Sequence, residues 1–154
     1  MDRFTLEPIG HVVGGREVVE DDRWGAVEAR IRLDHRHATP EMVRGLDEFS
    51  HLEVVFVFDR VDADAVEWGS RHPRGNPEWP RVGILAQRAK DRPNRIGVSR
   101  CELAGVDGTD LLVRGLDAVD GTPVLDVKPW LEGFAPRGAV RQAAWAEELM
   151  RGYW

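Results

Sequence analysis

The sequence predicts a mainly β protein, an antiparallel barrel or sandwich with one short helix and one C-terminal helix. Two observations support this class: many short strand-like segments are separated by turn residues, and only two segments carry helix signals. The chain has 154 residues, 42% of them hydrophobic, which is enough for one domain that spans residues 1–154. No strand, glycine-rich turn and helix occur in the order that a Rossmann nucleotide site requires, which argues against that fold.

The first half of the chain contains two predicted strands with a short helix between them. Apolar and charged side chains alternate over residues 26–33, a period of two that indicates a strand with one face in water. Thr39-Pro40-Glu41 predicts the start of the helix, because it combines a hydroxyl cap, an early proline and an acid near the positive end of the helix dipole. Residues 51–58, HLEVVFVF, are rich in β-branched and aromatic side chains, which predicts a strand buried on both faces.

The second half is predicted to begin with a long surface loop over residues 62–80, where proline and glycine are dense. Further along, Asp107-Gly108 stands between two extended runs and is a strong hairpin signal. Apolar residues recur at helical spacing over residues 140–150, so the C-terminal helix is expected over about residues 138–152. Further strands are predicted over residues 82–86, 96–103, 110–116 and 123–127.

Charge is unevenly distributed along the chain. The net charge is −6, but residues 71–100 contain eight Lys or Arg against only two acids. That excess is what a phosphate or carboxylate site needs, and a solvated arginine-rich loop without a ligand has the same composition. Charge alone does not decide between these two interpretations.

The sequence indicates no membrane segment and no oxidising compartment. Its most apolar run, residues 54–58, is far too short to cross a bilayer, and the N-terminus lacks the pattern of a secretory signal. The one cysteine, Cys101, cannot form an intrachain disulfide or a metal site of several thiolates. We therefore expect a cytoplasmic protein with no membrane partner.

The segment QRAKDRPNRIGVS, residues 87–99, concentrates charge that core packing does not explain. Its four cations repel one another unless anionic groups compensate them, and the compensating groups are either a ligand or the protein's own acids. Arg88 is a candidate for bidentate recognition of a ligand carboxylate.

Other polar residues have simpler structural interpretations. Three aspartates in residues 115–129 offer oxygen ligands, but an Asp-Gly pair shortly before a proline is ordinary turn chemistry, so no metal site is predicted. Asp126 and Lys128 share one face of a strand, where an ion pair is expected. His51 is interpreted as a core histidine.

Four signatures occur in order over most of residues 6–130: LEPIGHVV, VRGLDEFSHLEVVFVF, GILAQRAKDRPNRIGVSRCEL and VRGLDAVDGTPVLDVKPW. On these motifs the chain resembles the TsaA/TrmO family of S-adenosylmethionine-dependent methyltransferases. The resemblance implies a small antiparallel β-barrel that forms a homodimer and binds S-adenosyl-L-methionine near the dimer interface. It also implies a tRNA partner, methylated on the exocyclic amino group of threonylcarbamoyl-adenosine next to the anticodon.

The resemblance also implies roles for individual residues. Asp117 and Asn94 are the candidates for accepting the proton that the amino group loses. Lys90, Arg92 and Arg95 are expected to neutralise phosphates of the tRNA backbone. The expected cofactor-binding residues are Arg23, Trp24, Gly25, Phe58, Asp59, Arg88, Val98, Arg114, Gly115, Leu116 and Asp117.

The sequence departs from the family pattern at two positions. The usual RPNPIG reads RPNRIG here, with Arg95 in place of the second proline, and Asp59 replaces a histidine of some relatives. These departures and the acidic net charge leave two alternatives open. One is a methyltransferase that uses the same cofactor on a small molecule, and the other is a non-catalytic module that binds S-adenosylmethionine.

Overall fold

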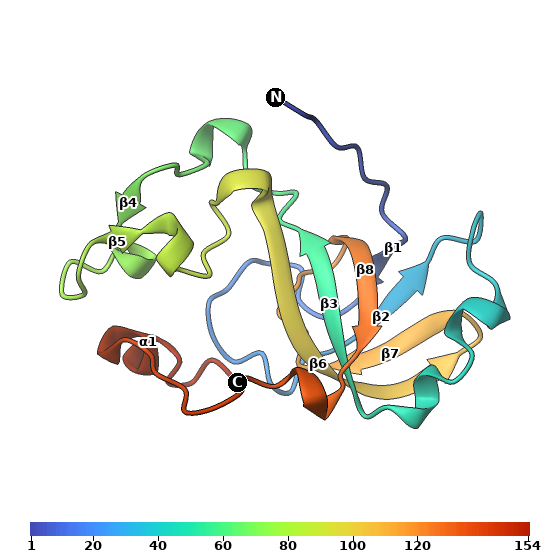
Figure 1. The fold of residues 1–154 in the computed structure, drawn as a ribbon. Helices are drawn as coiled ribbons and strands as arrows, with labels where there is room; N and C mark the ends of the chain where they lie inside the picture. The colour runs from blue at the N-terminus through green and yellow to red at the C-terminus, as the bar shows by residue number, and fades with distance from the viewer.

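A computed structural model describes all of residues 1–154 and contains a closed barrel of six strands (Figure 1). Around the barrel the strands follow the order β1, β2, β7, β6, β3, β8, and every neighbouring pair is antiparallel. The mainly β prediction is confirmed, and of its two architectures the structure has the barrel. The strand bounds are Gly10–Val13 (β1), Glu28–Leu33 (β2), His51–Val57 (β3), Ile96–Asp107 (β6), Asp110–Arg114 (β7) and Pro123–Pro129 (β8).

The β6–β7 hairpin forms where the Asp-Gly signal predicts it. Asp107 pairs with Asp110 across the turn, and Gly108 adopts the left-handed φ of 64° that favours glycine. β6 extends to Asp107, beyond the predicted end at residue 103, because the pairing with β7 continues to the turn.

The prediction that β3 is buried on both faces is wrong. Leu52, Val54 and Phe56 point into the barrel and are at most 2% exposed, whereas Val55 and Val57 on the outer face are only partly buried. A closed barrel is a single sheet whose inner face forms the core, so its strands alternate even where both sets of side chains are apolar. His51 also lies exposed on β3, its ring nitrogen 2.7 Å from the Ser50 hydroxyl, so the core interpretation of this histidine is wrong as well.

The segment between β3 and β6 forms a lobe on one side of the barrel (Figure 1). It contains two strands of two residues each, β4 (Ser70–Arg71) and β5 (Val82–Gly83), which pair with each other. The strand predicted over residues 82–86 is therefore only β5, followed by a 3-10 turn over Ile84–Ala86. Further 3-10 turns cover Ala63–Ala65, Pro73–Gly75 and Pro93–Arg95.

The helices are shorter than the sequence patterns indicate. The first is two 3-10 turns, Pro40–Val43 and Leu46–Glu48, separated at Gly45 by a left-handed φ of 81°. At the C-terminus α1 spans only Ala144–Leu149, after an exposed stretch and without a capping side chain at Ala143. The last of the seven 3-10 turns, Glu132–Phe134, precedes it. None of the helices combines the length and the apolar character needed to cross a membrane.

α1 lies beside the lobe on the same side of the barrel (Figure 1). The indole Nε1 of Trp79 donates a hydrogen bond of 2.9 Å to Glu148 of α1. The segment after α1 then returns to the barrel end, where the loop before β2 and the stretch after β7 lie. This return brings the last residues of the chain to the predicted cofactor-binding residues.

Candidate functional site

Two of the predicted cofactor-binding segments, Arg23–Gly25 and Arg114–Asp117, lie side by side. They do so because β2 and β7 are neighbours, with Glu28 opposite Arg114, and the pairing continues in a 2.9 Å hydrogen bond from the Gly115 amide to the Val27 carbonyl oxygen. A Cβ on Gly115 would lie 3.6 Å from the Gly25 carbonyl oxygen.

The carboxylate of Asp117 is the polar centre of this region. Its Oδ2 accepts a hydrogen bond from the hydroxyl of Tyr153, whereas its Oδ1 is buried and has no hydrogen-bond partner. A buried acceptor without a partner costs free energy unless a ligand or water supplies a donor. Tyr153 is not among the sequence-predicted site residues, since no motif surrounds the one tyrosine of the chain.

Arg88 lies near enough to Tyr153 for its charge to act on the phenol, and it contacts Val98. The Arg88 guanidinium donates to the carbonyl oxygen of Val98 on β6, and its charge acts on the Tyr153 phenol together with that of Arg74. Burial, followed by the negative charge of Asp117 and the hydrogen bond to it, raises the pKa of Tyr153 above its usual range, although the two arginines lower it.

We call this group, with the two segments described above, the Asp117 site. Its members are Arg23–Gly25, Arg74, Arg88, Val98, Arg114–Asp117 and Tyr153. Among them Arg74 is a further residue that sequence reasoning missed.

Trp24 forms a wall of the Asp117 site rather than an exposed stacking surface. Its side chain is 3% exposed, with the Arg16 guanidinium 4.4 Å from the ring centroid. Arg16 also donates to the carbonyl oxygens of Asp22 and Arg23, and Arg23 has a left-handed φ of 65°. The cation therefore holds the loop in a backbone conformation that residues other than glycine rarely adopt.

A second group forms where the RPNRIG motif meets the end of β3. The Phe58 amide donates to the Arg95 carbonyl oxygen at 2.8 Å, and the Phe58 ring packs edge-to-face on Phe56. Asp59 and Asn94 are exposed, and Asn94 has a left-handed φ of 61°. The hydrogen bonds of this group do not extend to Asp117.

The cations predicted to contact phosphates have partners within the chain. Arg92 donates to the Gln87 carbonyl oxygen at 2.7 Å and Arg95 donates to that of Val61 at 2.6 Å. Lys90 pairs with Asp91 at 2.8 Å. Of these three cations only Lys90 is exposed, because Arg92 and Arg95 are partly buried.

Asp91 is the acid whose negative charge compensates cations of this loop. Burial opposes its ionisation, but hydrogen bonds from Lys90 and Arg71 outweigh that effect and lower the pKa of Asp91. Asp91 thus compensates part of the positive charge inferred from the sequence, and backbone carbonyl oxygens accept the hydrogen bonds of Arg92 and Arg95.

The remaining polar candidates are structural. The Asp126–Lys128 ion pair forms as expected, and Asp120 accepts a 2.8 Å hydrogen bond from the Gly14 amide in a turn. No three His, Cys, Asp or Glu side chains are grouped so as to hold a metal ion. Cys101 is buried, and this burial, with a smaller effect of Asp117, raises the pKa of its thiol to about 12.

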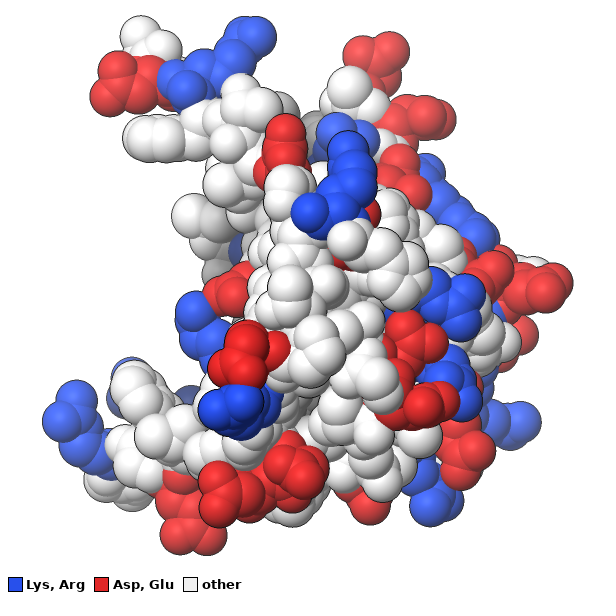
Figure 2. Space-filling view, turned by 90° about the vertical axis from the view of Figure 1, so that its right-hand side faces the viewer, with Lys and Arg blue, Asp and Glu red and all other residues white.

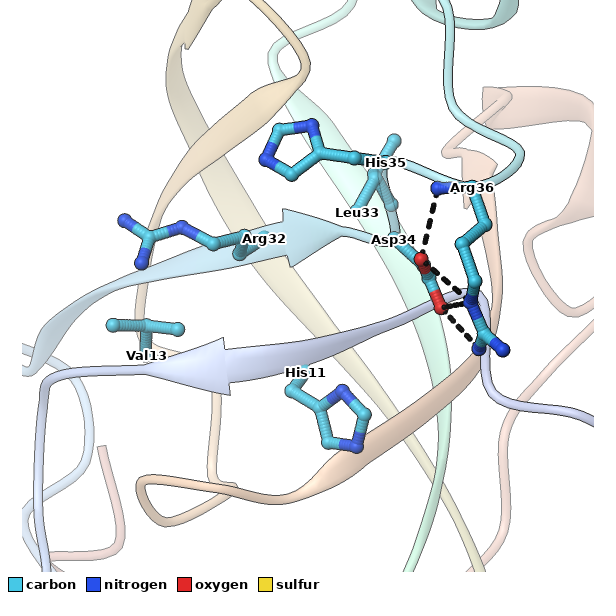
Figure 3. A pocket seen from close by; sticks show the side chains of 7 residues that line it. All are labelled: His11, Val13, Arg32, Leu33, Asp34, His35 and Arg36. Carbon is cyan, nitrogen blue, oxygen red and sulfur yellow. Dashed lines mark hydrogen bonds and ion pairs between the residues drawn. The ribbon is translucent and has the colours of Figure 1, made fainter.

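The surface also has a hollow of about 250 Å³ at β1 and β2, away from the predicted site residues (Figure 3). Asp34 and Arg36 point toward each other there, and the Arg36 hydrogen bonds hold the pKa of Asp34 well below its usual range. The charges in this hollow therefore compensate one another. Its lining residues are His11, Val13, Arg32, Leu33, Asp34, His35 and Arg36.

The face shown in Figure 2 carries both acidic and basic side chains, with acidic ones gathered along its lower edge. On β2 and the adjoining hairpin these charges pair: Arg30 contacts Asp107 at 3.0 Å and Arg32 contacts Asp110 at 3.3 Å. Exposed pairs of this kind contribute little to stability or binding.

Comparison with known proteins finds relatives that are named as tRNA methyltransferases or as S-adenosyl-L-methionine-binding proteins. It is 44% identical over 97 residues to the tRNA (adenine(37)-N6)-methyltransferase of Escherichia coli, which covers 59% of this chain and 40% of that protein. It is 38% identical over 112 residues to a probable S-adenosyl-L-methionine-binding protein of Archaeoglobus fulgidus, which covers 71% of this chain and 29% of that protein. The chain thus spans less than half the length of these relatives.

Comparison of the fold with solved structures agrees with these sequence similarities. The crystal structure of TrmO from Pseudomonas aeruginosa superposes with a TM-score of 0.75 at 26% sequence identity, over 93% of this chain and 63% of that one. The family model described as the tRNA-methyltransferase O N-terminal domain matches residues 21–135, which include the Asp117 site except for Tyr153. The chain therefore belongs to the TrmO/TsaA family.

Proposed function

We propose that this domain binds S-adenosyl-L-methionine at the Asp117 site and methylates the exocyclic amino group of threonylcarbamoyl-adenosine next to the anticodon of tRNA. The observation that carries the proposal is the buried Oδ1 of Asp117, which has no partner within the chain. Family membership and the names of the curated relatives support the same cofactor and the same class of substrate.

The residues of the Asp117 site fit the proposed cofactor. S-adenosyl-L-methionine consists of a nucleoside joined to an amino acid. Its hydroxyl and amino groups are hydrogen-bond donors for Asp117 Oδ1, and its carboxylate is an acceptor for a guanidinium. Arg88 uses one of its nitrogens on the Val98 carbonyl oxygen, which leaves further N–H donors for a carboxylate. When bound, the cofactor supplies a methyl group that its sulfonium makes electrophilic.

The protein's own contribution is alignment, exclusion of water and acceptance of a proton. Trp24 and Leu116 are buried walls that keep water from one side of the site. Holding donor and acceptor in line converts the reaction into an effectively unimolecular step. We propose Asp117 or Asn94 as the acceptor that faces the reacting amino group. The Asp117 carboxylate is a base that takes up the proton itself, whereas the Asn94 amide oxygen accepts a hydrogen bond from the amino group and the proton passes to water.

Calorimetry with S-adenosyl-L-methionine tests the site. Changing Asp117 to Asn should weaken binding about tenfold or more, since a hydrogen bond to a charged group contributes about 1.5–3 kcal/mol. Asp126→Asn is the matched control, because Asp126 pairs with Lys128 within β8, and the affinity of this variant should stay within about twofold of wild type. Equal affinity of wild type and Asp117→Asn would contradict the proposed site.

Transfer of labelled methyl groups to tRNA, followed by mass spectrometry of its nucleosides, tests the substrate. Label should appear in threonylcarbamoyl-adenosine and in no other nucleoside. Lys90→Ala should weaken tRNA binding and lower the slope of log affinity against log salt by about 1, as expected for one lost phosphate contact. A protein that binds the cofactor and leaves tRNA unlabelled would refute the tRNA assignment.

One observation favours a second candidate function, a module that binds S-adenosylmethionine and acts on no RNA. Two of the three cations proposed for phosphate contacts, Arg92 and Arg95, are held by carbonyl oxygens. Tight cofactor binding together with no measurable tRNA binding at low salt would favour this alternative. The homodimer that the family resemblance implies is a further part of the proposal, and light scattering at several protein concentrations tests it.

A further inference from the structure

The segment Gly152–Trp154 is attached to the Asp117 site through its backbone. The amides of Arg23 and Trp24 donate to the carbonyl oxygens of Gly152 and Tyr153, at 2.9 and 2.7 Å. A Cβ on Gly25 would lie 2.8 Å from the carbonyl carbon of Trp154, so the close approach depends on glycine at position 25.

A second attachment fixes the segment from its other end. Glu148 of α1 accepts the 2.9 Å hydrogen bond from Trp79 in the lobe, and the amide of Tyr153 donates to the Met150 carbonyl oxygen at 3.1 Å. The turn that presents Tyr153 is therefore held both by the lobe and by the loop before β2. Because it is attached on both sides, the segment forms a fixed wall of the Asp117 site.

The hydrogen bond from Tyr153 occupies one oxygen of the Asp117 carboxylate and leaves the other oxygen without a partner. The phenol is partly buried and stays protonated at neutral pH, so its hydroxyl is a donor and Asp117 Oδ2 is the acceptor. An ionised carboxylate accepts hydrogen bonds at both oxygens, and no donor of the chain reaches Oδ1. The orientation that Tyr153 imposes is the one that leaves Oδ1 for a donor from outside the chain.

We propose that Tyr153 is a positioning residue of the Asp117 site. Its hydroxyl fixes the Asp117 carboxylate with Oδ1 free to accept a hydrogen bond from a hydroxyl or amino group of the bound nucleoside, and residues 152–154 form the adjoining wall. This inference rests on the proposed binding of S-adenosyl-L-methionine. It adds a residue outside the matched range of the family domain, residues 21–135, to the site.

Calorimetry on four proteins tests the inference: wild type, Tyr153→Phe, Asp117→Asn and the double variant. Tyr153→Phe removes one hydroxyl and should weaken binding of S-adenosyl-L-methionine about tenfold, a value typical of a lost hydrogen bond to a charged group. In the Asp117→Asn background the same change should alter affinity less than about twofold, because Tyr153 acts through Asp117. In the methylation assay the KM for the cofactor should rise about tenfold while the KM for tRNA is unchanged.

Thr122→Val is the matched control for the loss of a hydroxyl. The Thr122 hydroxyl is buried and donates to the Val119 carbonyl oxygen at 2.7 Å, so its removal lowers stability without touching Asp117. A positioning role predicts that Tyr153→Phe changes affinity and Thr122→Val does not. Equal effects of the two variants on affinity would overturn the inference, as would tighter binding by Tyr153→Phe, which would identify the segment as a plug that occupies the site.

A measurement on the wild-type protein keeps the inference testable if a variant does not fold. Tyr153 is the one tyrosine of the chain, so tyrosine-specific labelling gives a single ring signal in an NMR spectrum. Saturation with S-adenosyl-L-methionine should shift that signal, and an unshifted signal at saturation would refute the role of Tyr153. Absence of cofactor binding by wild type would instead refute the proposed function itself, which distinguishes the two failures.

Discussion

Replacing Gly97 with alanine tests the packing between β6 and the end of β3, where the RPNRIG motif meets Phe58. A methyl group at Gly97 would lie 2.5 and 2.6 Å from two ring atoms of Phe56 and 2.9 Å from one of Phe58. Carbon atoms in contact are normally about 3.5–4.0 Å apart, so the overlap is about 1 Å. Phe56 is 2% exposed and its ring centroid is 5.2 Å from that of Phe58, so neither ring moves without the other.

The magnitude follows from comparison with Gly83→Ala. Gly83 has a φ of −59° and a Cβ there would meet nothing within 4 Å, so that variant gains only about 0.4–1 kcal/mol from the lower entropy of its unfolded chain. Gly97→Ala has the same entropic gain and in addition overpacks the core, which costs about 1–3 kcal/mol. The gain cancels between the variants, so Gly97→Ala should be less stable than Gly83→Ala by about 1–3 kcal/mol.

Equilibrium unfolding in urea measures the difference. The midpoint of Gly97→Ala should fall relative to Gly83→Ala while the slope of free energy against urea concentration stays the same, because the fold is retained. A difference in unfolding free energy smaller than about 0.5 kcal/mol would show that the two rings yield freely, and the packing described for this end of the barrel would be wrong.

Three further predictions rest on single groups. Cys101, whose thiol pKa burial raises to about 12, should react with a thiol reagent at pH 7 at least about 100 times more slowly in the native protein than in denaturant, and equal rates would contradict its burial. The raised pKa of Tyr153 keeps the phenol neutral in the folded protein, whereas in the unfolded chain the phenol ionises above its ordinary pKa of 10.0. The unfolding free energy should therefore fall as pH rises past about 10, and it should fall less in Tyr153→Phe, which lacks the phenol. Arg16→Ala should lower unfolding free energy by about 1–2 kcal/mol through loss of the contact with Trp24, whereas Arg44→Ala, which removes only an exposed ion pair with Glu41, should change it by less than about 0.5 kcal/mol.

The sequence predicts those elements whose signal is local. The alternation before Leu33 and the Asp-Gly pair at residues 107–108 each depend on a few consecutive residues, and both β2 and the β6–β7 hairpin form where they indicate. The run at β3 is apolar on both faces, and a linear pattern does not show whether a second layer covers the outer one. In the barrel no such layer covers Val55 and Val57, so they remain partly exposed.

The strands that the sequence patterns missed, β1 and β4, or made too long, β5, are short. β4 and β5 have two residues each and β1 has four, which is too few for a periodic pattern to be recognised. The apolar residues from Val140 follow helical spacing, but Gly138 has a left-handed φ of 80° and residues 131–144 are exposed. Without packing to stabilise it, this stretch becomes helical only at Ala144.

The membership of the Asp117 site was only partly predictable, for a reason of tertiary structure. Asp117 and Tyr153 are 36 residues apart in the chain, and their contact exists because the segment after α1 returns to the loop before β2. Motifs report residues that a family uses at a fixed place in the sequence. A partner supplied by a returning segment carries no such local mark.

The basic segment 71–100 shows why a count of charges overstates the cations available to a ligand. All eight of its cations have partners within the chain: four cations pair with three carboxylates, because Arg71 and Lys90 share Asp91, and the other four donate to backbone carbonyl oxygens. Carbonyl oxygens satisfy the hydrogen-bonding groups of an arginine but carry no formal charge, so they leave the local excess of positive charge in place. The segment therefore offers the proposed tRNA substrate a long-range attractive field more than a set of free hydrogen-bond donors. If tRNA binds there, its association rate should depend on salt more steeply than its dissociation rate does.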